Sequence, residues 1–289
     1  MRSLLFVPGD DEKKLGKSLA CGADAIIVDL EDSVAAAAKP EARVRARAFL
    51  GRARALERRP KLIVRVNPLP GGETDRDLEA VMPGAPDAIM LPKSLGGASV
   101  QELSVKLGVR EALEGLPDGA TAILAIATET AEALFAMASY RGASARLMGL
   151  AWGAEDLSAD LGAETNRDDL GYASPYRLAR DLTLLGATAA GVAPIDTIYA
   201  NFRDLDGLHA EAEAAQRDGF AGKMAIHPAQ VAVINAAFTP TPEAVRRARA
   251  VVAAFAANPG AGVVVLDGAM LDLPHLTRAR KVLWRAGES

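Results

Sequence analysis

The sequence predicts an α/β fold, a (β/α)8 TIM barrel with a C-terminal helical tail. Two observations lead to this prediction. Short apolar runs alternate with helix-like segments eight times along the chain, and each run is apolar continuously rather than at every second residue. Strands of a parallel sheet that is covered by helices have this continuous pattern. Eight strand-helix repeats then indicate a closed barrel.

The predicted strands recur from the beginning of the chain. The opening Met-Arg-Ser-Leu-Leu-Phe-Val-Pro-Gly contains the first strand, because four large apolar residues before Pro8 are too few for a signal-peptide core. The full set of strands covers residues 3–7, 25–30, 62–66, 88–91, 122–127, 147–152, 189–195 and 224–226. Helix-like segments lie between them at residues 11–20, 40–57, 100–113, 130–140, 175–185, 205–216 and 228–238.

A doubly wound open sheet is the alternative to a barrel. The first strand-helix turn, Val-Pro-Gly-Asp-Asp, lacks the glycine spacing of a dinucleotide-binding fingerprint, which favours the barrel. A chain of 289 residues with 50% hydrophobic content can bury a large core. The length alone permits two domains, and one barrel with a tail also fits it.

Composition restricts the partners and the compartment. The chain has 33 Lys and Arg against 37 Asp and Glu, well mixed, which gives no electrostatic footprint for nucleic acid or an anionic membrane. Since no stretch of about 18 uninterrupted apolar residues occurs, we expect no membrane-spanning helix. The single cysteine, Cys21, cannot form an intramolecular disulfide. We therefore expect a cytoplasmic protein.

The domain prediction places the TIM-barrel catalytic domain at residues 1–239 and a helical extension at residues 240–289. The extension contains a helix over residues 241–257, an Asn-Pro-Gly turn, an apolar run over 263–266 and a last helix from Pro274. It has no strand position in the barrel, yet its apolar residues require burial. We expect it to cover a barrel mouth or a neighbouring subunit, which predicts a homo-oligomer.

Two carboxylates end neighbouring strands of the predicted barrel. Glu129 follows the fifth strand and Asp156 the sixth, at the edge where such barrels hold their catalytic groups. Mg²⁺ is commonly bound by one or two carboxylates, so this pair predicts a magnesium site. The alternative is that each acid caps the helix that follows it. Glu155 is a competing ligand, but Asp156 is preferred because neighbouring side chains diverge at a strand end.

Arg65 lies in a third apolar run, Leu-Ile-Val-Arg-Val-Asn, and could bind a substrate carboxylate at two points. The alternative is a structural ion pair with Asp29 or Glu31 on the neighbouring strand. Strand two ends in Asp-Leu-Glu-Asp, a dense cluster of acids beside the predicted metal. Some of these acids are expected to orient water or Lys93 rather than to bind metal.

Eight motifs in order along nearly the whole chain resemble the citrate lyase β-subunit-like group of the HpcH/HpaI aldolase superfamily. They are Phe-Val-Pro-Gly-Asp, Val-Asp-Leu-Glu-Asp-Ser-Val, Lys-Pro-Glu-Ala-Arg, Val-Arg-Val-Asn, Met-Leu-Pro-Lys-Ser, Glu-Thr-Ala, Trp-Gly-Ala-Glu-Asp-Leu and Gly-Lys-Met-Ala-Ile-His-Pro-Ala-Gln. The resemblance implies a Mg²⁺-dependent (β/α)8 enzyme that makes or breaks a carbon-carbon bond next to a thioester carbonyl. It also implies an oligomer, a trimer or hexamer.

The same resemblance implies roles for individual residues. Glu129 and Asp156 match the metal ligands, Arg65 the arginine for the substrate carboxylate, and Glu31 an acid of the same pocket. The backbone of Gly153, Ala154 and Glu155 matches the loop that receives the carboxylate of the keto acid. Asp272 matches a tail acid that acts as acid or base in a neighbouring subunit's site. Its alternative role is a helix cap before Pro274.

The leading functional prediction is a Mg²⁺-dependent lyase that cleaves a malyl-, citramalyl- or citryl-CoA type thioester into a 2-oxo acid and an acyl-CoA. Aldolases for free pyruvate in the same superfamily use an early histidine, whereas all three histidines here, His209, His227 and His275, lie late. The alternatives are a condensing, malate-synthase-like or thioesterase activity at the same site, and a citrate lyase β subunit that acts only within a complex. The sequence does not identify the acyl group.

Overall fold

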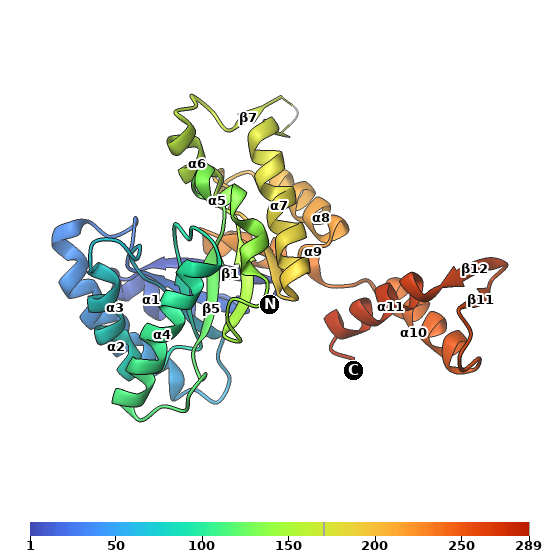
Figure 1. The fold of residues 1–289 in the computed structure, drawn as a ribbon, viewed down its shortest axis with the longest axis horizontal. Helices are drawn as coiled ribbons and strands as arrows, with labels where there is room; N and C mark the ends of the chain where they lie inside the picture. The colour runs from blue at the N-terminus through green and yellow to red at the C-terminus, as the bar shows by residue number, and fades with distance from the viewer. Residues whose placement is uncertain (170, 289) are drawn as a thin grey trace. The chain divides into compact units, whose positions relative to one another are not determined.

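The computed structural model describes residues 1–169 and 171–288, and it confirms the predicted barrel. Within this part of the chain, eight parallel strands close in the order β1-β10-β9-β6-β5-β4-β3-β2 (Figure 1). Sequential neighbours pair directly, except that a short hairpin of β7 (Arg167–Asp168) and β8 (Gly171–Tyr172) intervenes after β6. The barrel strands are β1 Ser3–Pro8, β2 Ala25–Asp29, β3 Lys61–Arg65, β4 Ala88–Leu91, β5 Ala122–Ile126, β6 Leu147–Ala151, β9 Ala193–Asp196 and β10 Gly222–Ala225.

Helices connect the barrel strands, as predicted. They are α1 Glu12–Ser18, α2 Lys39–Arg54, α3 Glu73–Val81, α4 Gly97–Glu114, α5 Ala131–Phe135, α6 Ala154–Leu161, α7 Ser174–Ala190, α8 Leu205–Asp218 and α9 Pro228–Phe238. Short 3-10 segments lie at η1 Ala36–Ala38, η2 Met82–Gly84 and η3 Met137–Tyr140. The single helix predicted at 130–140 is therefore two pieces, α5 and η3.

Three further boundaries differ from the prediction. The sequence prediction gave no bounds for α3 and α6, because both helices are short and α3 is mostly polar. The seventh barrel strand begins at Ala193, not at residue 189, since α7 continues to Ala190 and ends at Gly191 with a left-handed φ of 72°.

The barrel interior is a packed core to which all eight strands contribute. Because side chains alternate along a strand, every second residue points inward. The buried inner cluster consists of Leu4, Ala25, Ile27, Ile63, Ala88, Met90, Leu124, Ile126, Ala151, Ile195 and Met224. In β2 and β3 this alternation continues to Asp29 and Arg65. These two residues begin a charged layer that lies directly above the apolar one.

The chain divides into two compact units, Met1–Asn235 and Ala236–Ser289. The second unit contains α10 (Pro242–Ala256), the antiparallel hairpin of β11 (Val263–Leu266) and β12 (Ala269–Asp272), and α11 (Leu273–Arg285). Its own buried cluster consists of Ala248, Val251, Phe255, Val264, Leu271 and Ala279. The prediction missed β12, although Asp267-Gly268, with φ of 53° and 76°, is a typical hairpin turn.

None of the described helices is long and apolar enough to cross a membrane.

A buried ion pair ties α4 to the segments that lead into β5 and β6, at the end of the barrel opposite the predicted metal ligands. Glu111 accepts hydrogen bonds from both Nη atoms of Arg146 at 2.7 Å and from the amides of Gly119 and Thr121 at 3.0 and 2.8 Å. Burial acts to raise the pKa of Glu111, but these four bonds outweigh it and lower the pKa.

We predict that Glu111→Gln lowers the free energy of unfolding by about 3 kcal/mol, because it leaves the buried Arg146 charge with only the exposed Asp118 as an anion. Urea denaturation at pH 7 measures the loss. Glu114→Gln, an exposed acid on the same helix, is the control and should change stability by less than about 0.5 kcal/mol. Since the folded pKa is depressed, the Glu111 contribution is present above the unfolded pKa and is lost as the pH falls through the folded one. Equal stability of the two variants at pH 7 contradicts this account.

Candidate active site

The parallel register of the barrel places Asp29 directly opposite Arg65 at the ends of β2 and β3. Nε and Nη2 of Arg65 donate to the two carboxylate oxygens of Asp29 at 2.8 and 2.7 Å. Both side chains are nearly buried. Burial opposes both charges, but the paired bonds prevail, so the pKa of Asp29 is lowered and that of Arg65 is raised. This is the ion pair that the sequence offered as the alternative role of Arg65.

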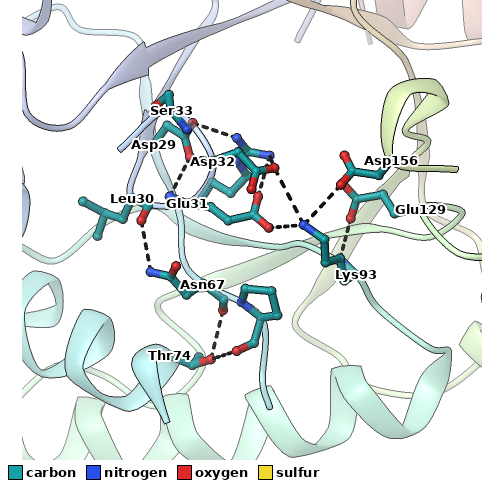
Figure 2. A network of polar contacts seen from close by, with 12 residues as sticks. Asp29, Leu30, Glu31, Asp32, Ser33, Asn67, Thr74, Lys93, Glu129 and Asp156 are labelled. Atoms are coloured by element: carbon teal, nitrogen blue, oxygen red, sulfur yellow. Dashed lines mark hydrogen bonds and ion pairs between the residues drawn. The ribbon is translucent and has the colours of Figure 1, made fainter. Parts of the chain in front are cut away.

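Glu31 extends this charged layer. Its Oε2 lies 2.6 Å from Nη1 of Arg65 as an ion pair, without hydrogen-bond geometry. The loop that carries Glu31 is held through its backbone carbonyls: Lys39 donates to Leu30 and Glu31 at 2.9 and 3.1 Å, and Asn67 donates to Leu30 at 3.0 Å. Figure 2 shows Asn67 in turn accepting from Thr74. The backbone therefore fixes where the acids of this loop lie.

Glu129 and Asp156 come together from neighbouring strand ends, Glu129 after β5 and Asp156 in the first turn of α6 after β6 (Figure 2). Glu129 is 2% exposed. Burial, and then the negative charge of Asp156, raises the pKa of Glu129 to about 8. Gly153 lies against it, because a Cβ at this position would be 2.7 Å from Cγ of Glu129. A glycine is therefore required for the two chain segments to approach this closely.

Neither carboxylate has the alternative role of a helix cap. The hydroxyl of Thr130 caps α5 by accepting from the amide of Ala133, and α6 begins after Gly153, so Asp156 is inside the helix. The first amides of α6, in Ala154 and Glu155, have no partner within the helix, and the helix dipole adds positive potential there. The side chain of Glu155, the competing metal ligand, accepts a hydrogen bond from Asn166 at 2.9 Å. This arrangement suits an anion at the amides and a cation at Asp156.

Lys93 links the two halves of the site. It follows β4 in the left-handed backbone conformation, with φ of 49°, which non-glycine residues seldom adopt. Its amide donates to Glu129, and its ammonium Nζ lies 2.6 Å from Glu31 and 3.2 Å from Asp156 (Figure 2). Burial would lower the pKa of Lys93, but the bond to Glu31 and the surrounding acids raise it.

A cavity of about 430 Å³ lies at this edge of the barrel. Predicted site residues that line it are Arg65, Glu129, Gly153, Ala154, Glu155 and Asp156, and Glu31 joins them through its ion pairs with Arg65 and Lys93. Apolar walls come from Phe6, Ile126, Ile198, Met224 and Ile226. Glu129 and Asp156 offer two carboxylates, and among the described residues no group of three or more His, Cys, Asp or Glu is arranged to hold a metal. Two carboxylates with water or substrate in the other positions fit Mg²⁺.

Asp272 belongs to the second unit, where it is the N-cap residue of α11. Its amide donates to Nδ1 of His275 at 3.3 Å, and its Oδ1 lies 2.5 Å from the same nitrogen. This contact lowers the pKa of Asp272. The capping role that the sequence gave as the alternative is thus present, and the catalytic role stays a prediction.

Two residues of the site were not among the predicted site residues, Asp29 and Lys93. Asp29 was considered as an ion-pair partner of Arg65 and as one of the acids that orient water or Lys93, and Lys93 only as a group that the acids orient. A sequence signal for both exists, since each lies at or just after the end of a strand, as Glu129 does. Applying the strand-end rule to every charged residue, and not only to acids with metal-ligand character, would have included them.

Comparisons with known proteins agree with this geometry. Residues 2–228 match the family model described as HpcH/HpaI aldolase/citrate lyase. The chain belongs to the HpcH/HpaI aldolase/citrate lyase family. This confirms the resemblance drawn from the eight motifs.

Members of the HpcH/HpaI aldolase/citrate lyase family match almost the full chain. A (3S)-malyl-CoA thioesterase of Cereibacter sphaeroides strain KD131 is 37% identical over 99% of this chain and 94% of its own length. The mitochondrial citramalyl-CoA lyase of Rattus norvegicus is 34% identical over 98% of this chain and 85% of its own. The crystal structure of CitE from Mycobacterium tuberculosis with magnesium, acetoacetate and coenzyme A has a TM-score of 0.78 and 35% identity, covering 99% of this chain and 98% of that one.

We predict that Asp29→Asn lowers the free energy of unfolding by about 3 kcal/mol, because an amide cannot accept both Arg65 bonds and leaves a buried cation partly unpaired. Chemical denaturation of the metal-free protein measures this loss. Asp32→Asn is the matched control from the same loop, with a side chain 57% exposed, and should change stability by less than about 1 kcal/mol. If both variants are as stable as the wild type, Arg65 does not depend on Asp29.

Proposed function

We propose that the protein is a Mg²⁺-dependent carbon-carbon lyase that acts on a 3-hydroxyacyl thioester of the malyl-, citramalyl- or citryl-CoA type and releases a 2-oxo acid and an acyl-CoA. One observation carries the proposal: Glu129, Asp156, Arg65 and the first amides of α6 meet at a single cavity. This combination supplies ligands for a hard cation and donors for a carboxylate. The relatives named for malyl-CoA and citramalyl-CoA support the thioester.

In this proposal Glu129 and Asp156 hold the metal, which agrees with the magnesium in the CitE structure. When bound, Mg²⁺ polarises the oxygens of the hydroxyl group and of the developing 2-oxo acid. The backbone amides of Ala154 and Glu155 receive the substrate carboxylate, and Gly153 leaves space beside Glu129. Arg65 uses two of its five N–H groups on Asp29, so the others remain for Glu31 and the substrate.

The reaction breaks the bond between the carbinol carbon and the carbon next to the thioester carbonyl. The hydroxyl proton leaves to a base, a new carbonyl forms on the 2-oxo acid, and the bonding electron pair moves to the thioester as an enolate. A proton then returns to that carbon and gives the acyl-CoA. Arg65 and the α6 amides hold the carboxylate in place throughout, Glu31 positions Arg65 and Lys93, and Asp272 carries the proton.

Asp272 reaches such a site from a second copy of the chain. In the β11-β12 hairpin, Val263 is paired with Asp272 and Val265 with Met270, so these four residues share one face. Val263, Val265 and Met270 are 49, 72 and 70% exposed, which leaves an apolar face around the acid without a cover within its own unit. A neighbouring subunit's cavity edge would cover it, and we propose a homo-oligomer, a trimer or hexamer, with shared sites.

A thioesterase or condensing activity at the same site is the second candidate, since the relative from Cereibacter sphaeroides is named as a thioesterase. In that case the site also admits a water molecule that attacks the thioester. A citrate lyase β subunit that acts only within a complex is the remaining alternative. We also propose a cytoplasmic location, since Cys21, the single cysteine of the chain, is compatible with a reducing compartment.

An assay with malyl-, citramalyl- and citryl-CoA distinguishes a lyase from a thioesterase. A lyase releases glyoxylate, pyruvate or oxaloacetate together with an acyl-CoA, whereas a thioesterase releases free CoA and no 2-oxo acid. The assay uses the purified chain without other subunits, and size-exclusion chromatography of the same sample measures its oligomeric state. Turnover by the chain alone excludes the obligate β-subunit alternative, and no turnover of any thioester contradicts the lyase proposal.

We predict that chelation abolishes turnover, that added Mg²⁺ restores it, and that Asp156→Asn weakens Mg²⁺ binding at least about 100-fold. Titration calorimetry on the metal-free protein measures the affinity. Glu132→Gln, an exposed acid in the first turn of α5, is the control and should bind Mg²⁺ as the wild type does. Wild-type affinity in Asp156→Asn combined with lost affinity in Glu155→Gln would assign the ligand to Glu155 instead.

We predict that Asp272→Ala and Asp156→Asn are each nearly inactive, and that a mixture with exchanged subunits regains part of the activity. The reason is that hybrid oligomers contain sites with Asp156 from one copy and Asp272 from another. Each variant mixed with itself is the control. If exchange is demonstrated by mass spectrometry and no activity returns, Asp272 is only a helix cap.

A further inference from the structure

Lys93 occupies the space between the acids of the site. Its ammonium lies 2.6 Å from Oε1 of Glu31, 3.2 Å from Oδ1 of Asp156 and 3.7 Å from Oδ2 of Asp32. The side chain is 33% exposed, so these ion pairs are only partly screened by solvent. Among the described residues, Lys93 is the lysine that forms ion pairs with Glu31 and Asp156.

The backbone of Lys93 contributes separately from its side chain. The amide donates to Glu129, while the side chain reaches Asp156, so the two proposed metal ligands are held by one residue. Its φ of 49° lies in the left-handed region, which few residues other than glycine adopt. Backbone outliers of this kind cluster at functional sites, where the surrounding contacts hold them in place.

We propose that Lys93 is a resident counter-cation of the metal site, which neutralises Asp156 and Glu31 in the metal-free protein and opposes Mg²⁺ binding. The inference rests on the metal site proposed above and goes beyond it by assigning what sets the affinity. The Lys93 ammonium and Mg²⁺ compete for the same carboxylate, that of Asp156. Binding of Mg²⁺ therefore requires the Lys93–Asp156 pair to weaken, and Glu31 retains the ammonium nearby.

Two effects of Lys93 both lower the affinity for Mg²⁺. The positive charge of Lys93 repels a divalent ion a few ångströms away, and its ion pair with Asp156 must be given up. The structure places this lysine at the boundary between buried and exposed, where such interactions are weaker than in a dry interior. We expect the sum to reduce Mg²⁺ affinity by about 10-fold relative to a chain without the ammonium.

The experiment compares Lys93→Met with the wild type as full-length, metal-free protein. Methionine keeps most of the length of the side chain and leaves the hydrogen bond from the backbone amide to Glu129 in place, but it removes the charge. Calorimetric titration with MgCl₂ should give a Kd about 10-fold lower for the variant. Thermal unfolding should show a lower Tm without metal and a larger rise in Tm on adding Mg²⁺, since the variant has lost its own cation. Lys106→Met is the control, because Lys106 on α4 is a similarly half-buried lysine whose ammonium lies 2.8 Å from Asp75 of α3.

A Kd that is unchanged or higher in Lys93→Met, with Lys106→Met at the wild-type value, overturns the proposal. If Lys93→Met does not fold, Glu31→Gln and the double variant Glu31→Gln/Lys93→Met provide the comparison, since the double variant removes one charge of each sign. The double variant should again bind Mg²⁺ about 10-fold more tightly than Glu31→Gln. Failure of Asp156→Asn to weaken binding in the wild-type background would instead refute the metal site itself, whatever Lys93 does.

Discussion

The constraint on which the site depends is the closure of a parallel barrel, because it brings the carboxyl ends of all its strands to one edge. At that edge five carboxylates, Asp29, Glu31, Asp32, Glu129 and Asp156, meet two cations, Arg65 and Lys93. Burial, and then the repulsion from the negative charge of Asp156, raises the pKa of Glu129 to about 8. A divalent cation relieves the remaining excess of negative charge.

The ion pairs of the site differ in how readily they can rearrange. The Asp29–Arg65 pair is nearly buried and fixed by strand register, so it acts as a rigid base for the charged layer. Asp156 and Lys93 are about one-third exposed and border the cavity. The structure thus separates a fixed ion pair from an adjustable one. In the proposed function, the metal and the substrate bind on the side of the adjustable pair.

The functions of the two compact units follow from their surfaces. The barrel unit contains the proposed metal ligands, the amides for the carboxylate and the cavity, but within it the acid that would carry the proton is not evident. The second unit has that acid, Asp272, on a hairpin face that is apolar and exposed. In the proposed homo-oligomer, this acid would complete the active site of a neighbouring subunit, and catalysis would then depend on assembly.

The sequence by itself determined the barrel, because continuous apolar runs and their eightfold repetition reflect burial of strands on both faces, which is a local pattern. It also determined that Glu129 and Asp156 lie at strand ends, and the motifs indicated the family. Only the tertiary structure decided that Arg65 binds Asp29, that Lys93 lies between Glu31 and Asp156, and that Gly153 must lack a side chain. These facts depend on strand register and on one left-handed residue, which bring together atoms from segments far apart in the chain, and no periodicity along the sequence records such contacts.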